Sequence, residues 1–424
     1  MSSRFNYGRT FLLGFGFLGI SIIWPIFNQF IPIFLQAGNP EFERQLLAEG
    51  REIPNIAGFG LAPSLALFIM TWDNILNMFI APWVGTKSDQ TWNRFGRRKP
   101  FILLGAPIAL LAFVFVPVAQ SVLAIAVFIF ITNLGMALFR SPTVAWLGDL
   151  FSAEDRSKAN GVINLMGGVG ALLAYFGGGI LFNQFGRTAP FIAGSIATAI
   201  FLIIALIFVR ESPSSAPVEK EYQNKILDNV KILFSNPDRS ALFILLGILL
   251  WFMGFSAFDA GLSSFAVFTL GMKAGTASIY AGTMTIFFLL FAVPAGFLGT
   301  RWGRERTIRI GLIGLAFSSL LGFFLVKGAV ALVVTLLFAG AFWAMVNVNS
   351  LPLIFDHGDE KQIGAYTGLY YFASQLASVL GPTLLGILVD ALGNQYRWLW
   401  LFAAVFMVIA LLVMFGVKRA KVTA

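Results

Sequence analysis

Three ionisable side chains lie within long apolar stretches of the sequence, namely Asp73, Arg140 and Asp259. An ionisable group near the centre of a bilayer costs about 3 kcal/mol or more, so each needs a partner or a water-filled cavity. With a rise of about 1.5 Å per helical residue, Asp73 lies roughly 18 Å from Gly85. Arg140 lies roughly 14 Å from Asp149 on the same basis, which puts both side chains near one depth. We expect them to pair or compete, so that the protonation state of Asp73 depends on Arg140 and on solvation.

One alternative is a permanent structural salt bridge between Asp73 and Arg140. A further alternative is that the two side chains lie in separate places. Asp259 and Asn28 are expected at matching depths, where each could bind a substrate or hold an outer gate. Buried amides without a partner are costly, which favours a substrate-binding role for further polar residues inside apolar stretches. These are Gln29, Asn133, Asn347, Asn349, Tyr371 and Gln375. Trp24, Trp251 and Trp343 offer flat faces for stacking, although helix or lipid packing is the stronger interpretation of any one tryptophan.

The elements that position these residues must be membrane helices. Hydrophobic residues make up 58% of the 424 residues and charged residues only 12%, too few to cover a water-soluble core. With no cysteine and one histidine, no disulfide, metal centre, cofactor or enzymatic reaction is expected. The net charge of +9 comes from basic residues in short loops between apolar stretches. That distribution indicates membrane topology rather than nucleic-acid binding.

Twelve stretches are long and apolar enough to cross a hydrocarbon core of about 30 Å as helices of about 20 residues. Their expected cores are residues 11–35, 61–84, 101–119, 122–147, 161–182, 189–209, 241–270, 278–298, 308–326, 329–355, 364–389 and 398–417. The sequence therefore predicts an all-α membrane protein with twelve transmembrane helices. Six are expected in an N-terminal half, residues 1–210, and six in a C-terminal half, residues 241–424. Residues 211–240 are expected to form a polar cytoplasmic linker with a short amphipathic helix.

Lysine and arginine are distributed unevenly between the two sides of this topology. With both termini in the cytoplasm, 22 of the 29 basic residues fall on the cytoplasmic side and six on the other. The positive-inside rule therefore predicts a multi-pass protein of the cell (inner or plasma) membrane with cytoplasmic termini. The outer segment 36–60 is expected to be a solvated connection rather than a lid.

Residues recur at fixed spacings between the two halves. A shift of 207 pairs Arg140 with Asn347, Asp149 with Asp356 and Gly179 with Gly386, and a shift of 231 pairs Asn28 with Asp259. The stretch 85–98 also returns in a shorter form at 296–304. Several matches together favour a duplicated six-helix unit. Glycine runs such as 177–179 are assigned to helix packing within one half.

The stretch after the second apolar segment carries a family resemblance. It reads Ser88-Asp89, four further residues, then Arg94-Phe95-Gly96-Arg97-Arg98. This pattern resembles the loop 2-3 signature of the major facilitator superfamily, in the form found in the sucrose and maltose symporters and the glycoside-pentoside-hexuronide cation symporters. Trp72-Asp73-Asn74, Arg140-Ser141-Pro142 and Arg156-Ser157-Lys158 extend the resemblance along the chain. It implies a fold of two six-helix halves and substrate-binding roles for Asn74 and Arg140.

The loop signature also predicts a cytoplasmic gate. Its candidate residues are Gly85, Asp89, Arg94, Gly96, Arg97, Arg98, Asp149 and Arg156. We expect Asp89 to accept hydrogen bonds from backbone amides and from an arginine across the seam between the halves, which would hold an outward-open state. Simple marking of the topology by charge is the alternative.

These patterns together predict a secondary active transporter that works by alternating access. The expected cargo is a glycoside such as a sucrose- or maltose-like disaccharide, carried by symport with a proton that Asp73 and Arg140 couple. Sodium is a weaker expectation, because the second helix has one acid where the sodium-using relatives it resembles have two. A sodium-coupled sugar symporter, a lysolipid or amphiphile carrier and a non-transporting membrane sensor are the alternatives. The sequence has no phosphate-binding loop of the Gly-x-x-x-x-Gly-Lys type, so ATP-driven pumping is not expected. Twelve helices that enclose their own cavity predict a functional monomer.

Overall fold

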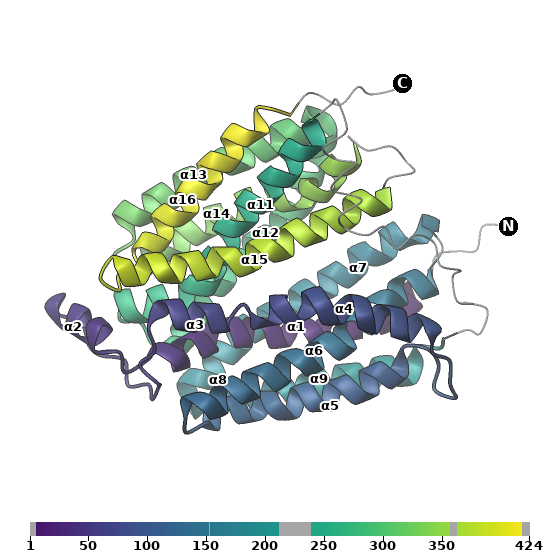
Figure 1. The fold of residues 1–424 in the computed structure, drawn as a ribbon, viewed down its shortest axis with the longest axis horizontal. Coiled ribbons are helices and arrows are strands. Elements are labelled where there is room, and N and C mark those ends of the chain that lie inside the picture. Colours follow the sequence, from purple (N-terminus) through teal and green to yellow (C-terminus); the bar gives the residue numbers. More distant parts are fainter. Residues whose placement is uncertain (1–5, 152, 212–238, 357–362, 418–424) are drawn as a thin grey trace.

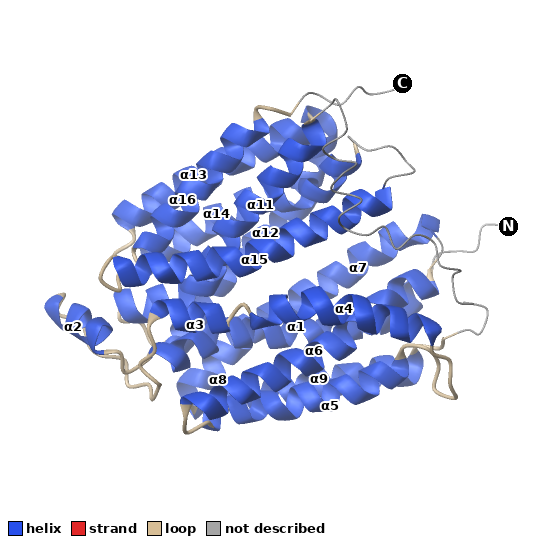
Figure 2. Ribbon diagram, in the orientation of Figure 1, coloured by secondary structure: helices blue, strands red, loops and turns tan. Residues whose placement is uncertain are grey.

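The computed structural model describes residues 6–151, 153–211, 239–356 and 363–417. Among these residues the named elements are all helical, joined by loops (Figure 2). An N-terminal bundle contains α1 (Tyr7–Gln36), α3 (Pro63–Ile69), α4 (Trp72–Gln90), α5 (Lys99–Phe115), α6 (Val122–Leu150), α7 (Ala153–Leu172), α8 (Gly178–Phe185) and α9 (Ala189–Phe208). A C-terminal bundle contains α11 (Ser240–Ser264), α12 (Ala274–Trp302), α13 (Arg304–Leu325), α14 (Ala329–Phe355), α15 (Ile363–Ala391) and α16 (Trp398–Met414). Figure 1 shows the two bundles side by side, with the short α2 (Pro40–Ala48) at one end.

Eleven helical segments of the described residues are long and apolar enough to cross a membrane, and the shorter α16 completes twelve. The expected twelve-helix, all-α membrane fold is therefore confirmed. Most of the expected linker, residues 212–238, lies outside the described residues. Two crossings are interrupted in ways the hydropathy pattern did not predict. One is divided into α3 and α4, and another passes from α7 through a π-helical turn, Leu173–Gly177, into α8.

The break between α3 and α4 falls at Met70 and Thr71. The Thr71 hydroxyl donates to the carbonyl of Phe68 at 2.8 Å, and the backbone amide of Asn74 donates to the carbonyl of Thr71 at 3.0 Å. Asp73 therefore lies in the first turn of α4. The positive end of a helix dipole favours a negative charge there, which reduces the cost of placing this acid within a membrane crossing.

The two bundles touch closely at one end of the molecule, which we call the α2 end because α2 lies there (Figure 1). A Cβ atom on Gly179 would overlap the carbonyl oxygen of Gly275, and one on Gly386 would lie 2.7 Å from the Cα of Ser64. Gly179 and Gly386 are repeat mates, and each allows backbone contact between the bundles. The assignment of Gly179 to packing within one half was therefore wrong, because its nearest neighbour belongs to the other bundle.

Polar bonds reinforce both of these contacts. Four residues after Gly179, the amide of Asn183 donates to the Thr276 hydroxyl at 3.1 Å. Four residues after Gly386, the carboxylate of Asp390 accepts from the backbone amide of Ser64 at 3.2 Å. Two pairs of elements, α8 with α12 and α3 with α15, thus hold the bundles together at the α2 end.

The outer segment between α1 and α3 is partly docked on the bundles, which corrects in part the expectation of a solvated connection for residues 36–60. It forms α2, whose N-terminus is capped by the Asn39 side chain accepting from the backbone amide of Glu41 at 3.0 Å. Phe42 and Leu46 of α2 are each 2% exposed. The segment is folded against the bundles because an amphipathic helix of this kind buries its apolar face.

Candidate functional site

A cavity of about 240 Å³ lies between the bundles and brings five of the predicted site residues together. Its lining comes from α1, the α3–α4 break, α4, α6, α11 and α15: Trp24, Asn28, Met70, Asp73, Asn74, Arg140, Phe255, Ser256, Asp259, Ala260, Ser378 and Pro382. Every ionisable residue that the sequence placed in mid-span therefore faces one space. This is the arrangement expected when intramembrane charges line a polar cavity rather than lipid.

Asp73 and Arg140 line this cavity without forming an ion pair among the described side chains. The amide of Asn74 donates to Oδ1 of Asp73 at 2.7 Å. The Arg140 guanidinium lies over the ring of Trp24, with its central carbon 5.8 Å from the ring centroid. A permanent salt bridge is therefore not present in this structure. The acid and the cation are near enough to share one cavity, and each is held by a separate neutral partner.

Asn28 and Asp259 meet across the seam between the bundles. The Asn28 amide of α1 donates to Oδ2 of Asp259 of α11 at 3.1 Å. Their matching depth, expected from the internal repeat, is confirmed by this contact. The bond is a polar link between the bundles at the cavity itself, so a ligand that competes for either group changes how the bundles are joined.

An apolar compartment of about 210 Å³ adjoins the polar cavity, and Phe255 and Asp259 line both. Its other lining residues are Tyr175, Leu262, Ala281, Met284, Thr285, Phe288 and Trp343. The rings of Phe255 and Trp343 are stacked with centroids 3.8 Å apart and planes 3° from parallel. Together the two spaces fall within the roughly 300–1,000 Å³ typical of small-molecule sites. They offer hydrogen-bonding groups on one side and flat apolar surfaces on the other.

The remaining polar candidates lie outside these two spaces. Gln29 and Asn133 are buried, and their side-chain amide atoms have no hydrogen-bond partner in the described part of the chain. Asn349 donates to the carbonyls of Ala295 and Met345, both at 3.0 Å. The bond to Ala295 joins α14 to α12. The side-chain amide of Asn349 thus donates only to backbone carbonyls among the described residues.

Asn347 and Gln375 are half-buried on α14 and α15, and neither lines the two spaces. Tyr371 of α15 is 55% exposed, with its ring edge-on to Tyr370. Among the tryptophans, Trp24 and Trp343 line the spaces, whereas Trp251 is fully buried in the C-terminal bundle. The sequence could not rank these residues because each lies in an apolar helix and hydropathy does not show which side of a helix faces the cavity.

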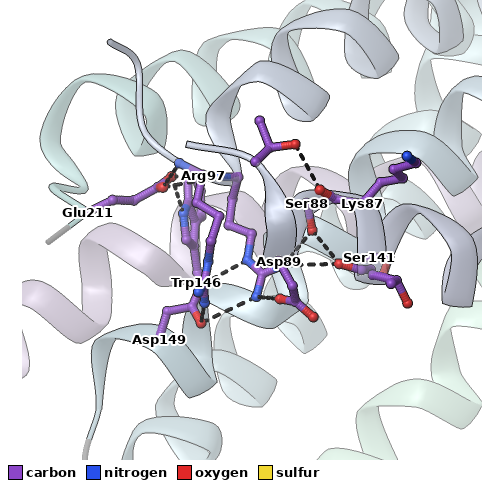
Figure 3. A network of polar contacts seen from close by, with 12 residues as sticks. Lys87, Ser88, Asp89, Arg97, Ser141, Trp146, Asp149 and Glu211 are labelled. Carbon is purple, nitrogen blue, oxygen red and sulfur yellow. Dashed lines mark hydrogen bonds and ion pairs between the residues drawn. The ribbon is translucent and has the colours of Figure 1, made fainter. Parts of the chain in front are cut away.

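A charged network lies at the opposite end of the molecule, near the described termini, and Figure 3 shows it in close view. Asp149 of α6 accepts from Nε of Arg98 at 2.8 Å and also pairs with Arg97. Arg98 further pairs with Asp89 and donates to the Ser88 hydroxyl. Burial alone would lower the pKa of Arg98, but the hydrogen bonds and charges of Asp149 and Asp89 raise it above its ordinary value.

In this structure Asp89 has a partner within its own bundle, and the contact across the seam expected for an outward-open state stays a prediction. The arginine that pairs with Asp89 is Arg98, which is close by in the chain and belongs to the same bundle, and not an arginine across the seam. Arg94 is exposed, with its guanidinium stacked 4.6 Å over the ring of Phe95. The carbonyl of Gly85 accepts from the Ser88 hydroxyl at 2.9 Å. The side chain of Arg156 lies outside the described residues.

Glu211 is a member of this network that the sequence reasoning missed. Its carboxylate accepts from the backbone amides of Arg97, Arg98 and Lys99 and from Nε1 of Trp146 at 2.9 Å (Figure 3). Gly96 has a φ of +111°, and a Cβ atom there would lie 2.5 Å from Oε2 of Glu211. The end of α9 thus caps the start of α5. Glycine at position 96 is needed both for the backbone angle and for the close approach of the carboxylate.

The C-terminal bundle repeats the core of this network. Arg304 pairs with Asp356 and donates to the carbonyl of Pro352 at 3.3 Å. Residues 304 and 356 are the repeat mates of Arg97 and Asp149, which are also paired. The internal repeat therefore extends from sequence spacing to side-chain geometry.

Two helical bundles around a central polar cavity define the class of membrane transporters with duplicated six-helix units. The chain belongs to the Major Facilitator Superfamily, whose family model matches residues 9–287 and 262–423. The family indicates a transporter rather than an enzyme.

Curated relatives differ in the cargo that their names state. The Escherichia coli tetracycline resistance protein, class B, is 24% identical over 413 residues, covering 93% of this chain and 91% of that protein. The Arabidopsis thaliana sucrose transport protein SUC3 is 23% identical over 228 residues, covering 42% and 38%. The human proton-associated sugar transporter A is 26% identical over 190 residues, covering 39% and 25%.

The fold is also that of solved transporters. The nucleoside transporter NupG, in the form of a point mutant, superposes with a TM-score of 0.75 over 97% of this chain and all of that one, at 14% identity. At that identity the likeness shows the fold alone.

Proposed function

We propose that the protein carries a glycoside, most simply a sucrose- or maltose-like disaccharide, in symport with a proton by alternating access. The observation that carries the proposal is the shared cavity of Asp73, Arg140, Asn28 and Asp259. The names of two partial relatives, a sucrose transport protein and a proton-associated sugar transporter, support the sugar and the proton. The proposal places the protein in the cell membrane as a functional monomer with cytoplasmic termini.

Proton coupling follows from the way Asp73 is held. Its carboxyl lies in the cavity with an amide donor from Asn74 and with Arg140 free of any ion pair among the described residues. When the carboxyl is charged, Arg140 is drawn toward it. When it is protonated, Arg140 is released to bind the oxygen atoms of cargo. Proton binding and cargo binding then favour each other, as symport requires.

Substrate recognition is assigned to polar groups on both bundles. Asn74 and Arg140 belong to the N-terminal bundle, and Asp259 belongs to the C-terminal one, with Asn28 bonded to it. A sugar hydroxyl that accepts from Asn28 or donates to Asp259 replaces a bond between the bundles by one to cargo. Gln29, Asn133, Asn347, Asn349, Tyr371 and Gln375 are retained as proposed contacts of other conformations. On this scheme residues 1–210 and 241–424 are the two moving halves, joined by the linker 211–240.

The test is uptake into proteoliposomes of labelled sucrose, maltose, melibiose and a hexose, with an imposed pH gradient and with or without sodium. We expect accumulation that follows the pH gradient without sodium. Asp73→Asn should abolish accumulation but keep exchange of labelled for unlabelled cargo, because an amide resembles a protonated carboxyl. Glu43→Gln, an acid of α2 far from the cavity, is the matched control and should behave as wild type. Sodium-dependent uptake, or full accumulation by Asp73→Asn, would refute the coupling scheme.

A second candidate is transport of flat, amphiphilic molecules, and the apolar compartment with its Phe255–Trp343 stack favours it. The name of the tetracycline resistance relative, which aligns along nearly the whole chain, supports the same cargo class. Adding a lysolipid and a planar amphiphilic dye to the panel separates the candidates. Movement of these compounds with no movement of sugars would replace the sugar proposal. Binding without any movement would favour a sensor.

A further inference from the structure

The segment between α1 and α3, residues 37–62, joins the two bundles in a way that their helix packing does not require. Both of its ends belong to the N-terminal bundle, since α1 ends at Gln36 and α3 begins at Pro63. Its middle lies on the C-terminal bundle. A segment tethered to one body and bound to the other resists their separation at that end of the molecule. We call residues 37–62 the strap.

The apolar face of α2 supplies the first attachment to the C-terminal bundle. The ring of Phe42 is stacked on Phe268, with centroids 4.7 Å apart and planes 7° from parallel. It also packs at 5.7 Å against the ring of Tyr396, between α15 and α16. Phe42 is 2% exposed, so its burial depends on this docked position. Undocking α2 would expose the whole ring to water.

Polar contacts supply the second attachment, and they end on backbone carbonyls of three separate C-terminal loops. The Gln45 amide donates to the carbonyl of Gly393 at 2.6 Å. The Arg51 guanidinium donates to the carbonyls of Thr269 and Lys327 and pairs with Glu49 at 3.1 Å. The carbonyls of helix and loop ends need donors, which the strap provides.

A third set of bonds fixes the root of the strap. Gln36 donates to the Ser264 hydroxyl at 3.0 Å and accepts from the hydroxyl of Tyr396. Burial raises the pKa of Tyr396, so this hydroxyl stays protonated and remains a donor. On the N-terminal side, Arg187 donates to the carbonyl of Ala57 at 2.9 Å.

We infer that the strap is a conformational restraint that holds the α2 end of the transporter closed. Opening that end must separate the bundles at Gly179–Gly275 and Gly386–Ser64, and the docked strap adds Phe42, Gln45 and Arg51 to the contacts that must break. The strap therefore shifts the balance between the two access states toward the one open at the opposite end. This inference needs only two access states and is independent of the identity of the cargo.

The experiment measures separation at the α2 end directly. The chain has no cysteine, so spin labels can be placed at single sites without removing any native residue. Leu123→Cys at the start of α6 and Val330→Cys at the start of α14 are suitable, because these residues are 75% and 79% exposed and touch none of the strap contacts above. Pulsed electron paramagnetic resonance in liposomes then gives the distribution of distances between the bundles. Hydrogen exchange of residues 40–48 reports separately whether α2 has undocked.

Two variants are designed to release the strap by different routes, and a third variant is the control. Phe42→Ala removes the stacked ring, and Arg51→Ala removes the carbonyl contacts. Arg44→Ala is the matched control, since Arg44 pairs only with Glu41 of the same helix among its described ion pairs and is 72% exposed. We expect the long-distance population to rise by about tenfold or more in Phe42→Ala, given the cost of losing a buried ring, and to stay unchanged in Arg44→Ala.

Each outcome decides the question. Faster exchange of α2 together with longer distances supports the strap as a restraint. Faster exchange with an unchanged distance distribution overturns it, and so do longer distances with α2 still docked, because the bundles would then separate without release of the strap. An equal rise in Arg44→Ala would also overturn it, because the effect would not depend on contact with the C-terminal bundle. If Phe42→Ala fails to fold, Arg51→Ala gives the same test without disturbing the apolar face.

Discussion

Replacing Glu211 by alanine should destabilise the N-terminal bundle by about 2–3 kcal/mol. The start of α5 has no cap of its own, because the side chain of Arg98 at the N-cap position makes no capping bond. Glu211 supplies that cap from the end of α9 by accepting from three successive backbone amides. Loss of a helix cap costs about 1–2 kcal/mol, and orphaning the buried indole of Trp146 adds about 1 kcal/mol.

Thermal unfolding of the purified protein in detergent, followed by tryptophan fluorescence, measures this effect. For a unit of about 200 residues the expected loss corresponds to a fall of roughly 4–12 °C in the unfolding midpoint. Glu211→Gln keeps one acceptor and should fall between alanine and wild type. Glu41→Ala is the control, because its pair with Arg44 is solvent-exposed and such pairs contribute less than about 1 kcal/mol. A midpoint for Glu211→Ala within about 1 °C of wild type would show that the cap is dispensable, since the predicted loss is several times larger.

Two further substitutions test the seam and the cavity. Gly179→Leu drives a side chain into the Gly275 carbonyl, so spin labels at the α2 end should lie farther apart, whereas Gly177→Leu, with nothing within 4 Å of its Cβ position, should leave the distances unchanged. If both variants behave alike, close approach at Gly179 is not what closes this end. Trp343→Ala removes the ring stacked on Phe255, and we expect affinity for an aryl or alkyl glycoside to fall about tenfold in a binding titration, with a smaller change for a simple hexose. Equal losses for both ligands would show that the apolar compartment does not contribute to selectivity.

The twelve crossings could be predicted because hydropathy over about 20 residues is a local property of the chain. The departures from that pattern are not marked by hydropathy. Neither glycine nor proline marks the break at Met70–Thr71 in the sequence. Likewise, nothing local distinguishes a solvated α2 from a docked one, because the partners of Phe42 lie in the other half of the chain.

The candidate site was predictable in part for the same reason. The intramembrane charges Asp73, Arg140 and Asp259 were identified by their cost in lipid, and the structure brings all three to one cavity. Glu211 was missed because it lies at a span end, where acids are ordinary. A signal existed, however, in the start of α5: Arg97-Arg98-Lys99 places cations where a helix needs an acceptor, which indicates a cap from elsewhere in the fold.

The internal repeat separates what is structural in this protein from what is proposed to be functional. At the bundle ends several repeat mates make matching contacts. Arg97 pairs with Asp149 and Arg304 with Asp356, and Gly179 and Gly386 both lie at contacts between the bundles. The charged cavity residues Arg140 and Asp259 have uncharged repeat mates, Asn347, which does not line the cavity, and Asn28, which does. A symmetric scaffold gives each bundle the same way of moving, whereas coupling requires that a proton and a cargo molecule act on the two bundles differently. Chemical asymmetry is therefore present at the cavity, where coupling would have to occur, and the three charges that line it are the physical reason to direct mutagenesis first at Asp73, Arg140 and Asp259.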